Sequence, residues 1–290
     1  MPDAPPPLVH RHESPTGSWE VAHPGPDARP LPCAARVVGF AETPRATARR
    51  RELPSLEVPL ILSFGAPYRV AAGGASGGIV APREGFAAGL GETYALTETT
   101  GAAACVQVNL DPVGARLLLG VPMSELAGRA VGVAELFGAE GVLLVERLHD
   151  AAGWAERLAL ARSFVDARLA AAGPPCPGVA HALRRLREAG GAVEVRALAA
   201  ELGWSRKHLA ARFREVVGLP PKAVARILRF RRALRLLEGP PGAVPWSEVA
   251  LRCGYYDQAH FNRDFRGFTG TTPRDYLRRR MGEGLDALAE

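Results

Sequence analysis

Residues 244–276 read VPWSEVALRCGYYDQAHFNRDFRGFTGTTPRDY, and this stretch decides the fold of the last third of the chain. Residues 247–252 have helical spacing, and the helix is expected to end at Gly254 because glycine accepts the left-handed conformation that closes a last turn. Asp257 can cap a second helix with an apolar stripe at positions i, i+4 and i+7, namely Phe261, Phe265 and Phe268. A short helix, a glycine-containing turn and a longer helix with a polar, basic outer face predict a helix-turn-helix motif, whose second helix enters the major groove of DNA.

The same pattern occurs about fifty residues earlier. Residues 194–202 form a short amphipathic helix that Gly203 ends, and Ser205 can cap the next helix, which runs to Gly218. Its apolar stripe consists of Leu209, Phe213 and Val216. The sequence therefore predicts two helix-turn-helix motifs in tandem.

Between the motifs, residues 220–237 predict one continuous helix, because proline is tolerated at its start and apolar residues recur along one face. At about 1.5 Å per residue this helix is roughly 27 Å long, somewhat less than one DNA turn of about 34 Å. A rod of this length can hold two recognition helices in successive major-groove segments. One subunit would then read an asymmetric site made of two boxes.

Residues 178–280 resemble the DNA-binding domain of the AraC/XylS family of bacterial transcription regulators. The resemblance is strongest in the second motif, at Cys253, Gly254, Tyr255, His260, Phe261, Arg263, Phe265, Gly270 and Pro273. Two positions depart from the family pattern. Trp246 stands where an aliphatic residue is usual, and Ala211 stands where the first recognition helix commonly has a basic residue. The second departure puts base reading by the first motif in doubt.

The resemblance also implies which residues contact DNA. Those expected to contact base edges are Arg206, Lys207, Ala211, Gln258, Ala259 and Arg263. Those expected to contact phosphates are Ser205, Arg214, His260, Asn262 and Arg266. Arginine and lysine suit guanine, and glutamine suits adenine, whereas phosphate contacts position the protein without reading sequence. For His260 we also expect a packing role at the turn.

The amino-terminal part differs from the carboxy-terminal part in composition and in apolar periodicity. Residues 1–32 contain nine prolines and little periodicity, and we expect a disordered leader. Residues 36–110 hold short apolar runs broken by glycine and proline (ARVVGF, LEVPLILSFG, YRVA, GGIVAP, CVQVNL), which predict strands of a small sandwich or barrel. Residues 111–172 predict helices, with a break between two of them near 150–153.

The expected class is therefore α+β, with a β-rich sandwich or barrel and trailing helices followed by an all-α domain. The boundaries we expect are a sensing and dimerisation domain at 33–172, a linker at 173–178, the AraC-type domain at 179–281 and a tail at 282–290. The resemblance implies that the first domain is cupin-like. The sequence allows the helices at 141–172 either to pack on the barrel or to pair with the same helices of a second subunit, and the resemblance favours a homodimer here.

Charge is distributed unevenly along the chain. The total is +6, but residues 174–281 hold 21 arginines and lysines against 9 acidic residues, a net of +12. Only this segment has the charge of a polyanion binder. The partners expected are double-stranded DNA, RNA polymerase and a small-molecule effector.

Neither a metal nor a cofactor is expected, and the protein is not expected to be an enzyme. The four cysteines are more than seventy residues apart, and no histidine falls in the strand region. Four polar residues are ligand-pocket candidates, with ordinary surface roles as the more frequent alternative: Arg36, Arg69, Glu92 and Tyr94. No secretory signal or run of about 18 apolar residues occurs, so we expect a cytoplasmic protein. The alternative function is a small-molecule-binding protein or enzyme whose basic domain is a protein adaptor.

Overall fold

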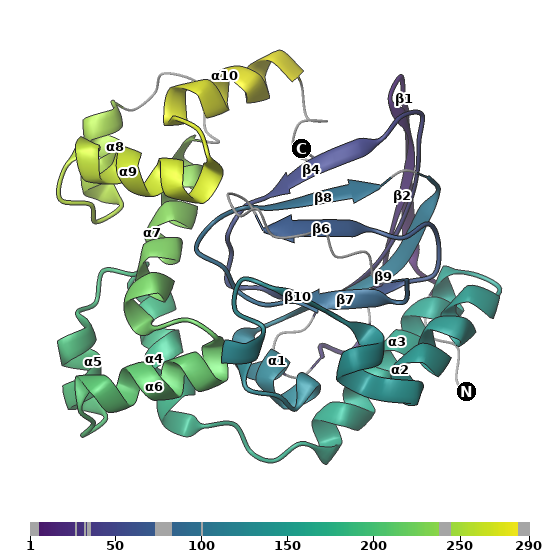
Figure 1. Ribbon diagram of the computed structural model, residues 1–290, viewed down its shortest axis with the longest axis horizontal. Helices are drawn as coiled ribbons and strands as arrows, with labels where there is room; N and C mark the ends of the chain where they lie inside the picture. The colour runs from purple at the N-terminus through teal and green to yellow at the C-terminus, as the bar shows by residue number, and fades with distance from the viewer. Residues whose placement is uncertain are drawn as a thin grey trace.

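The computed structural model describes residues 6–26, 28–31, 33, 36–72, 83–99, 101–237 and 245–283, with the backbone alone at 72 and 279–283. Strands occupy the first part of the chain and helices the rest, so the predicted α+β class is confirmed. Figure 1 shows the sheets with α1, α2 and α3 on one side of the molecule, and α4 to α10 on the other.

Two antiparallel sheets form the β-rich part. The strands are β1 (Leu8–Ser14), β2 (Gly17–His23), β3 (Arg36–Pro44), β4 (Ala48–Glu52), β5 (Val58–Ser63), β6 (Arg69–Ala72), β7 (Gly85–Ala88), β8 (Ala95–Thr99), β9 (Ala103–Leu110) and β10 (Ala130–Gly132). The larger sheet has the order β1-β2-β3-β9-β5-β7-β10, and the smaller one has the order β4-β8-β6. This is the two-layer arrangement that the alternating apolar runs predicted.

The alternation of side chains along β5 divides the core in two. Leu60 and Leu62 are fully buried in the large core that includes the helices, whereas Ile61 joins a smaller cluster with Tyr68, Val70, Phe86, Ala103 and Cys105. Successive residues of a strand point to opposite faces of the sheet, which is why neighbours in sequence enter different cores. One face of the larger sheet therefore carries the helices, and the other faces the smaller sheet.

The prediction of a disordered leader is wrong for residues 8–23. These residues form the antiparallel hairpin β1–β2, and β2 pairs with β3 at the edge of the larger sheet. Among the residues that the structure describes, the prolines of this segment lie outside the strands, and Pro15 lies in the turn between them. The hairpin is further held by the Trp154 indole, which donates a hydrogen bond to Glu20 at 3.1 Å.

The strand predictions were partly right. The runs ARVVGF, LEVPLILSFG, YRVA and CVQVNL coincide with β3, β5, β6 and β9, whereas GGIVAP lies outside the described residues. Sequence reasoning missed β4, β7, β8 and β10. Strand β4 reads ARRRE, and its polar side chains are satisfied by neighbours, since Arg49 pairs with Glu98 at 3.0 Å and Arg50 pairs with the buried Glu42.

Helices α1 (Pro112–Leu119), α2 (Val133–Asp150) and α3 (Trp154–Ala171), with the short η2 (Met123–Glu125), complete the amino-terminal half. The predicted break near residues 150–153 is confirmed. Helix α4 (Pro177–Glu188) begins inside the predicted linker, because proline is accepted in the first turn of a helix. Among the described residues, no helix is long and apolar enough to cross a membrane.

The remaining helices are α5 (Val195–Glu201), α6 (Arg206–Val217), α7 (Pro221–Leu237), α8 (Trp246–Arg252), α9 (Gln258–Thr269) and α10 (Pro273–Glu283). Both predicted helix-turn-helix motifs are therefore present, with α7 as the long helix between them. The predicted stripes are in the core, since Leu209, Phe213, Phe261, Phe265 and Phe268 are each fully buried. Figure 1 shows α6 and α9 at opposite ends of α7, both lying across it.

Candidate nucleic-acid interface

Local hydrogen bonds fix both ends of α9. The Asp257 carboxylate accepts a hydrogen bond from the backbone N–H of His260 at 2.6 Å, which satisfies one of the free donors at the helix start. Gly270 ends the helix in the left-handed conformation, with φ of 71°. Local groups therefore define where α9 begins and where it ends.

Helix α6 is built in the same way. The Ser205 hydroxyl accepts a hydrogen bond from the backbone N–H of His208 at 3.1 Å, and Gly218 ends the helix with φ of 89°. Ser205, predicted as a phosphate contact, thus already serves as the helix cap, although its own O–H can still donate. The two motifs share one local design, which the two matching stretches of sequence had indicated.

Each recognition helix presents one exposed face. On α6, Lys207, Ala211 and Arg214 are exposed and follow one another at spacings of four and three residues, with Arg206 at the first helical position. On α9, the exposed residues of the outer face are Gln258, Ala259, Asn262, Arg263 and Arg266. The structure therefore brings the predicted residues together in two groups, one on each recognition helix.

The cations on these faces have no acidic partner among the residues that the structure describes. Within the described part of the chain, no carboxylate forms an ion pair with Arg206, Lys207, Arg214, Arg263 or Arg266. Other arginines of the same helices and their neighbours are paired, including Arg212 with Glu215 and Arg252 with Glu248. The unpaired charges are those best placed to exchange solvent counterions for phosphates.

His260 differs from the other predicted contacts. Its side chain is about one third exposed, its ring meets that of Tyr255 edge-on at 5.3 Å, and its Nε2 lies 3.9 Å from the buried Asp264 carboxylate. The Arg226 guanidinium also holds Asp264, with Nη2 at 2.9 Å from Oδ1. Burial raises the pKa of the neighbouring Tyr255 hydroxyl. This geometry agrees with the packing role that we expected for His260 beside a phosphate contact.

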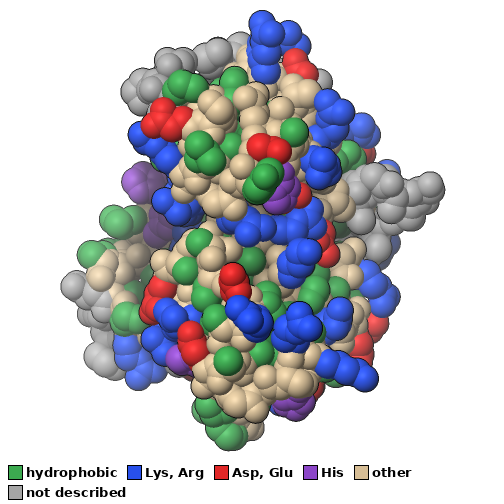
Figure 2. All heavy atoms as spheres, turned by 90° about the vertical axis from the view of Figure 1, so that its left-hand side faces the viewer, with side chains coloured by type: hydrophobic (Ala, Val, Ile, Leu, Met, Phe, Trp, Pro, Cys, Tyr) green, Lys and Arg blue, Asp and Glu red, His purple; other side chains and the backbone are tan. Residues whose placement is uncertain are grey.

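Sequence reasoning missed several exposed groups of this domain. Tyr256 is 88% exposed and directly precedes the cap of α9. Arg231, Arg232 and Arg235 are exposed on α7 without a carboxylate partner in the described residues. Tyr256 could have been found from the sequence, because it is an aromatic residue in a predicted turn and has no apolar partner at helical spacing. Figure 2 shows Lys and Arg side chains gathered in a band across the middle of the face that carries the two motifs.

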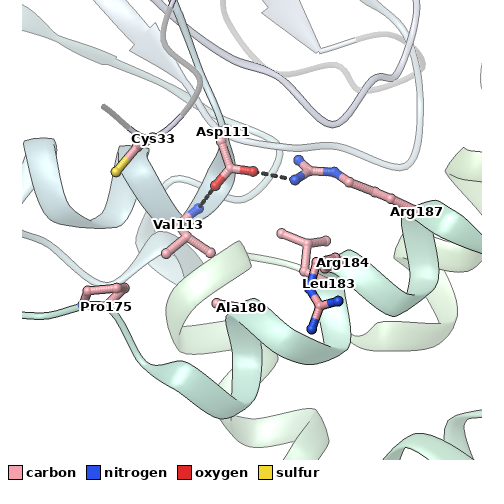
Figure 3. A pocket seen from close by; sticks show the side chains of 8 residues that line it. All are labelled: Cys33, Asp111, Val113, Pro175, Ala180, Leu183, Arg184 and Arg187. Atoms are coloured by element: carbon pink, nitrogen blue, oxygen red, sulfur yellow. Dashed lines mark hydrogen bonds and ion pairs between the residues drawn. The ribbon is translucent and has the colours of Figure 1, made fainter. Parts of the chain in front are cut away.

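The two halves of the chain meet at a small cavity of about 230 Å³. In Figure 3, Cys33, Asp111 and Val113 line it from the amino-terminal half, and Pro175 and α4 line it from the other. Arg187 of α4 forms an ion pair with Asp111 at 2.5 Å, and the same carboxylate caps α1 through the N–H of Val113 at 2.8 Å. The cavity therefore lies beside a direct ionic link between the halves.

The four ligand-pocket candidates do not line this cavity. Arg36 forms an exposed pair with Glu57 at 3.3 Å. Glu92 and Tyr94 instead contact the carboxy-terminal half, through Arg226 and Gly270 respectively. Within the described residues, no group of three histidine, cysteine, aspartate or glutamate side chains could hold a metal ion.

Comparison with known proteins agrees with this geometry. Residues 198–279 match a family model described as a helix-turn-helix domain. Over 86 residues the chain is 38% identical to the HTH-type transcriptional regulator GlxA of Rhizobium meliloti, a match that covers 30% of this chain and 26% of that protein. Residues 198–279 form an AraC-type helix-turn-helix domain.

Solved structures with similarity to the chain include AdpA and ToxT. The DNA-binding domain of AdpA, crystallised with a target DNA, is 30% identical over 37% of this chain and 98% of that one, with a TM-score of 0.33. ToxT from Vibrio cholerae is 9% identical over 84% of this chain and 98% of that one, with a TM-score of 0.45. Since the chain spans about a quarter of the length of GlxA, the AraC-type domain is the part that this relative supports.

Proposed function

We propose that the protein is a DNA-binding transcription regulator whose recognition helices α6 and α9 read two major-groove boxes about one turn apart. The observation that supports this most is the pair of exposed basic faces at the two ends of α7, whose cations have no acidic partner in the described part of the chain. At about 1.5 Å per residue, the 17 residues of α7 span roughly 26 Å. That length suits two helices in successive grooves on one side of a duplex.

In this proposal the two motifs contribute differently. In α9, Gln258 suits adenine and Arg263 suits guanine, whereas the methyl group of Ala259 can contact only the thymine methyl. In α6, Arg206 and Lys207 supply polar groups, and Ala211 supplies none. We therefore expect the α9 box to be read more strictly than the α6 box. Ser205, Arg214, Asn262, Arg266 and His260 are assigned to phosphates.

The proposal includes modulation at the amino-terminal half by a small-molecule effector or a partner. Support comes from the contacts between the halves, because a change at Asp111, Glu92 or Tyr94 reaches helices of the AraC-type domain directly. The regulator would act on transcription through DNA binding and through contact with RNA polymerase.

Selection of bound duplexes from a random pool, with the full chain near physiological salt, tests the proposal. Recovery of two short boxes with centres about one turn apart is the expected result. Recovery of salt-sensitive binding without any sequence preference would contradict it, since phosphate contacts alone would then account for all affinity. A variant with Gln258→Ala and Arg263→Ala is the matched control, and its selected sites should lose the stricter box.

A further inference from the structure

The amino-terminal half contacts both recognition helices at the same place, their carboxy-terminal ends. A side chain at Gly218, which ends α6, would meet the carbonyl oxygen of Met123 at 2.9 Å. A side chain at Gly270, which ends α9, would meet the Tyr94 ring at 2.7 Å. In Figure 1 the ends of both helices lie against the part of the molecule that holds the strands.

The contact at α6 is mainly apolar. The helix packs against η2 and α1, Met123 is fully buried, and Leu219, which follows the cap, is 7% exposed. The ion pair between Arg187 and Asp111 adds a link from α4 to the start of α1. Because apolar burial is non-directional and grows with the area removed from water, this side holds the first motif firmly.

The contact at α9 is polar and specific. Arg51 of β4 donates a hydrogen bond to the carbonyl oxygen of Thr269, the last residue of α9, at 2.6 Å. The Arg51 guanidinium also lies 4.4 Å from the centre of the Tyr94 ring. Glu92 accepts a hydrogen bond at 2.8 Å from Arg226, which in turn holds Asp264 of α9. These groups hold the carboxy-terminal end of α9 in place against the amino-terminal half.

The base-facing groups stay free in this arrangement. Gln258, Arg263 and Arg266 are exposed, while the contacts with Arg51 and Tyr94 lie at the end of the helix. The contact between the halves is therefore compatible with an occupied major groove.

We propose that the amino-terminal half sets the spacing and angle between the two recognition helices, with Arg51, Glu92 and Tyr94 as positioning residues for DNA reading by α9. The inference rests on the proposed two-box function. It adds that the amino-terminal half controls the relative position of the two recognition helices. The first motif is held to the sheets by apolar packing, and the second motif is held to the same body by polar contacts. The two motifs are then connected both through α7 and through the amino-terminal half. Each of these connections fixes the distance between the two boxes.

The test uses the full chain and a set of duplexes that carry both selected boxes, with the spacer lengthened or shortened by one base pair. One base pair moves the second box by about 3.4 Å and turns it by about 35°. For each protein, the measured quantity is the ratio of its affinity for the best spacer to its affinity for the altered ones. This ratio does not depend on the fraction of active protein.

The wild-type ratio is expected to be about tenfold, within the usual range of coupling between two sites, and the ratios of Glu92→Gln and Tyr94→Ala are expected to fall towards one. Glu92→Gln leaves the pair of Arg226 with Asp264 in place, so the packing of α9 itself is preserved. Glu57→Gln is the matched control, because Glu57 pairs with the exposed Arg36 away from α9.

Wild-type ratios in both variants, or an equal loss of affinity at every spacer, would overturn the inference. A wild-type chain that prefers no sequence at all would instead contradict the proposed function, so the two failures are distinguishable. Thermal melting of each variant separates a loss of folding from a loss of spacing preference.

Discussion

Single side chains on α9 divide into those that can read bases and those that can only attract the DNA backbone. Arg263 and Arg266 are both exposed and unpaired within the described residues, but they project at different angles from the helix. The difference matters because a base contact discriminates between sequences, whereas a phosphate contact strengthens binding to all of them.

We predict that Arg263→Ala lowers affinity for the best site by about 1–3 kcal/mol and relaxes one base position, whereas Arg266→Ala weakens binding to every sequence. The slope of log affinity against log salt should fall by about 0.9 for Arg266→Ala, because one fewer counterion is released. Fluorescence titrations against the best site and its single-base variants measure both effects. Equal losses on all sequences for Arg263→Ala would assign it to a phosphate.

At this scale, the buried aromatic residues could be predicted and the partners of the surface residues could not. Phe261, Phe265 and Phe268 follow a local period that burial enforces. Glu92 and Arg226 are 134 positions apart, and no local pattern reveals that they meet. For Glu92 and Tyr94 the sequence offered a ligand pocket or, more often, an ordinary surface role, and it revealed neither Arg226 nor Gly270 as their neighbours.

Among the elements, α9 depends on its first turn. Its four initial N–H groups have no partners within the helix, and the Asp257 carboxylate satisfies one of them. The negative charge of Asp257 also lies at the positive end of the helix dipole. The cap thus stabilises the end of the helix that is proposed to enter the groove.

We expect Asp257→Ala to lower the free energy of unfolding by about 1 kcal/mol, because one helix donor loses its partner. Chemical denaturation followed by circular dichroism measures the change. Asp257→Asn is the matched control and should retain most of the stability, since asparagine caps helices as well as aspartate does. If alanine and asparagine destabilised the protein equally, the charge rather than the hydrogen bond would be responsible.

Elements with strong local signals were predicted, and elements defined by their neighbours were missed. The motif helices carry caps, closing glycines and apolar periods in the sequence itself. Strands β1, β2 and β4 are rich in polar residues, and they are strands because neighbouring strands supply their hydrogen-bond partners: β1 pairs with β2, β2 pairs with β3, and β4 pairs with β8. Composition suggested disorder for residues 8–23, since it records prolines but not their position at the ends and the turn of a hairpin.

At the scale of the whole molecule, α2 and α3 carry exposed apolar and small side chains. Leu143 is 56% exposed on α2, and α3 presents a row of small exposed residues at four-residue spacing, Ala155, Ala159, Ser163 and Ala167. This surface falls within residues 141–172, the segment proposed for a homodimer. Small side chains allow two helices to approach closely.

If the homodimer forms there, Leu143→Asp should shift the protein from dimer to monomer, because an unpaired charge would be buried at the centre of the interface. Sedimentation velocity at micromolar concentration measures the change, and Glu146→Gln on the same helix is the control. A wild-type chain that is monomeric, or a dimer that tolerates Leu143→Asp, would contradict the proposed interface.

The docking of Gly218 and Gly270 against the strand-bearing half has a practical consequence for protein engineering. A chimera that exchanges one half of the chain replaces one side of this contact. A substituted helix-turn-helix domain whose recognition helices end in a residue larger than glycine would clash with Met123 or Tyr94, even if that domain were correctly folded. Functional chimeras of this protein should therefore be chosen by matching these two end positions, not by overall identity.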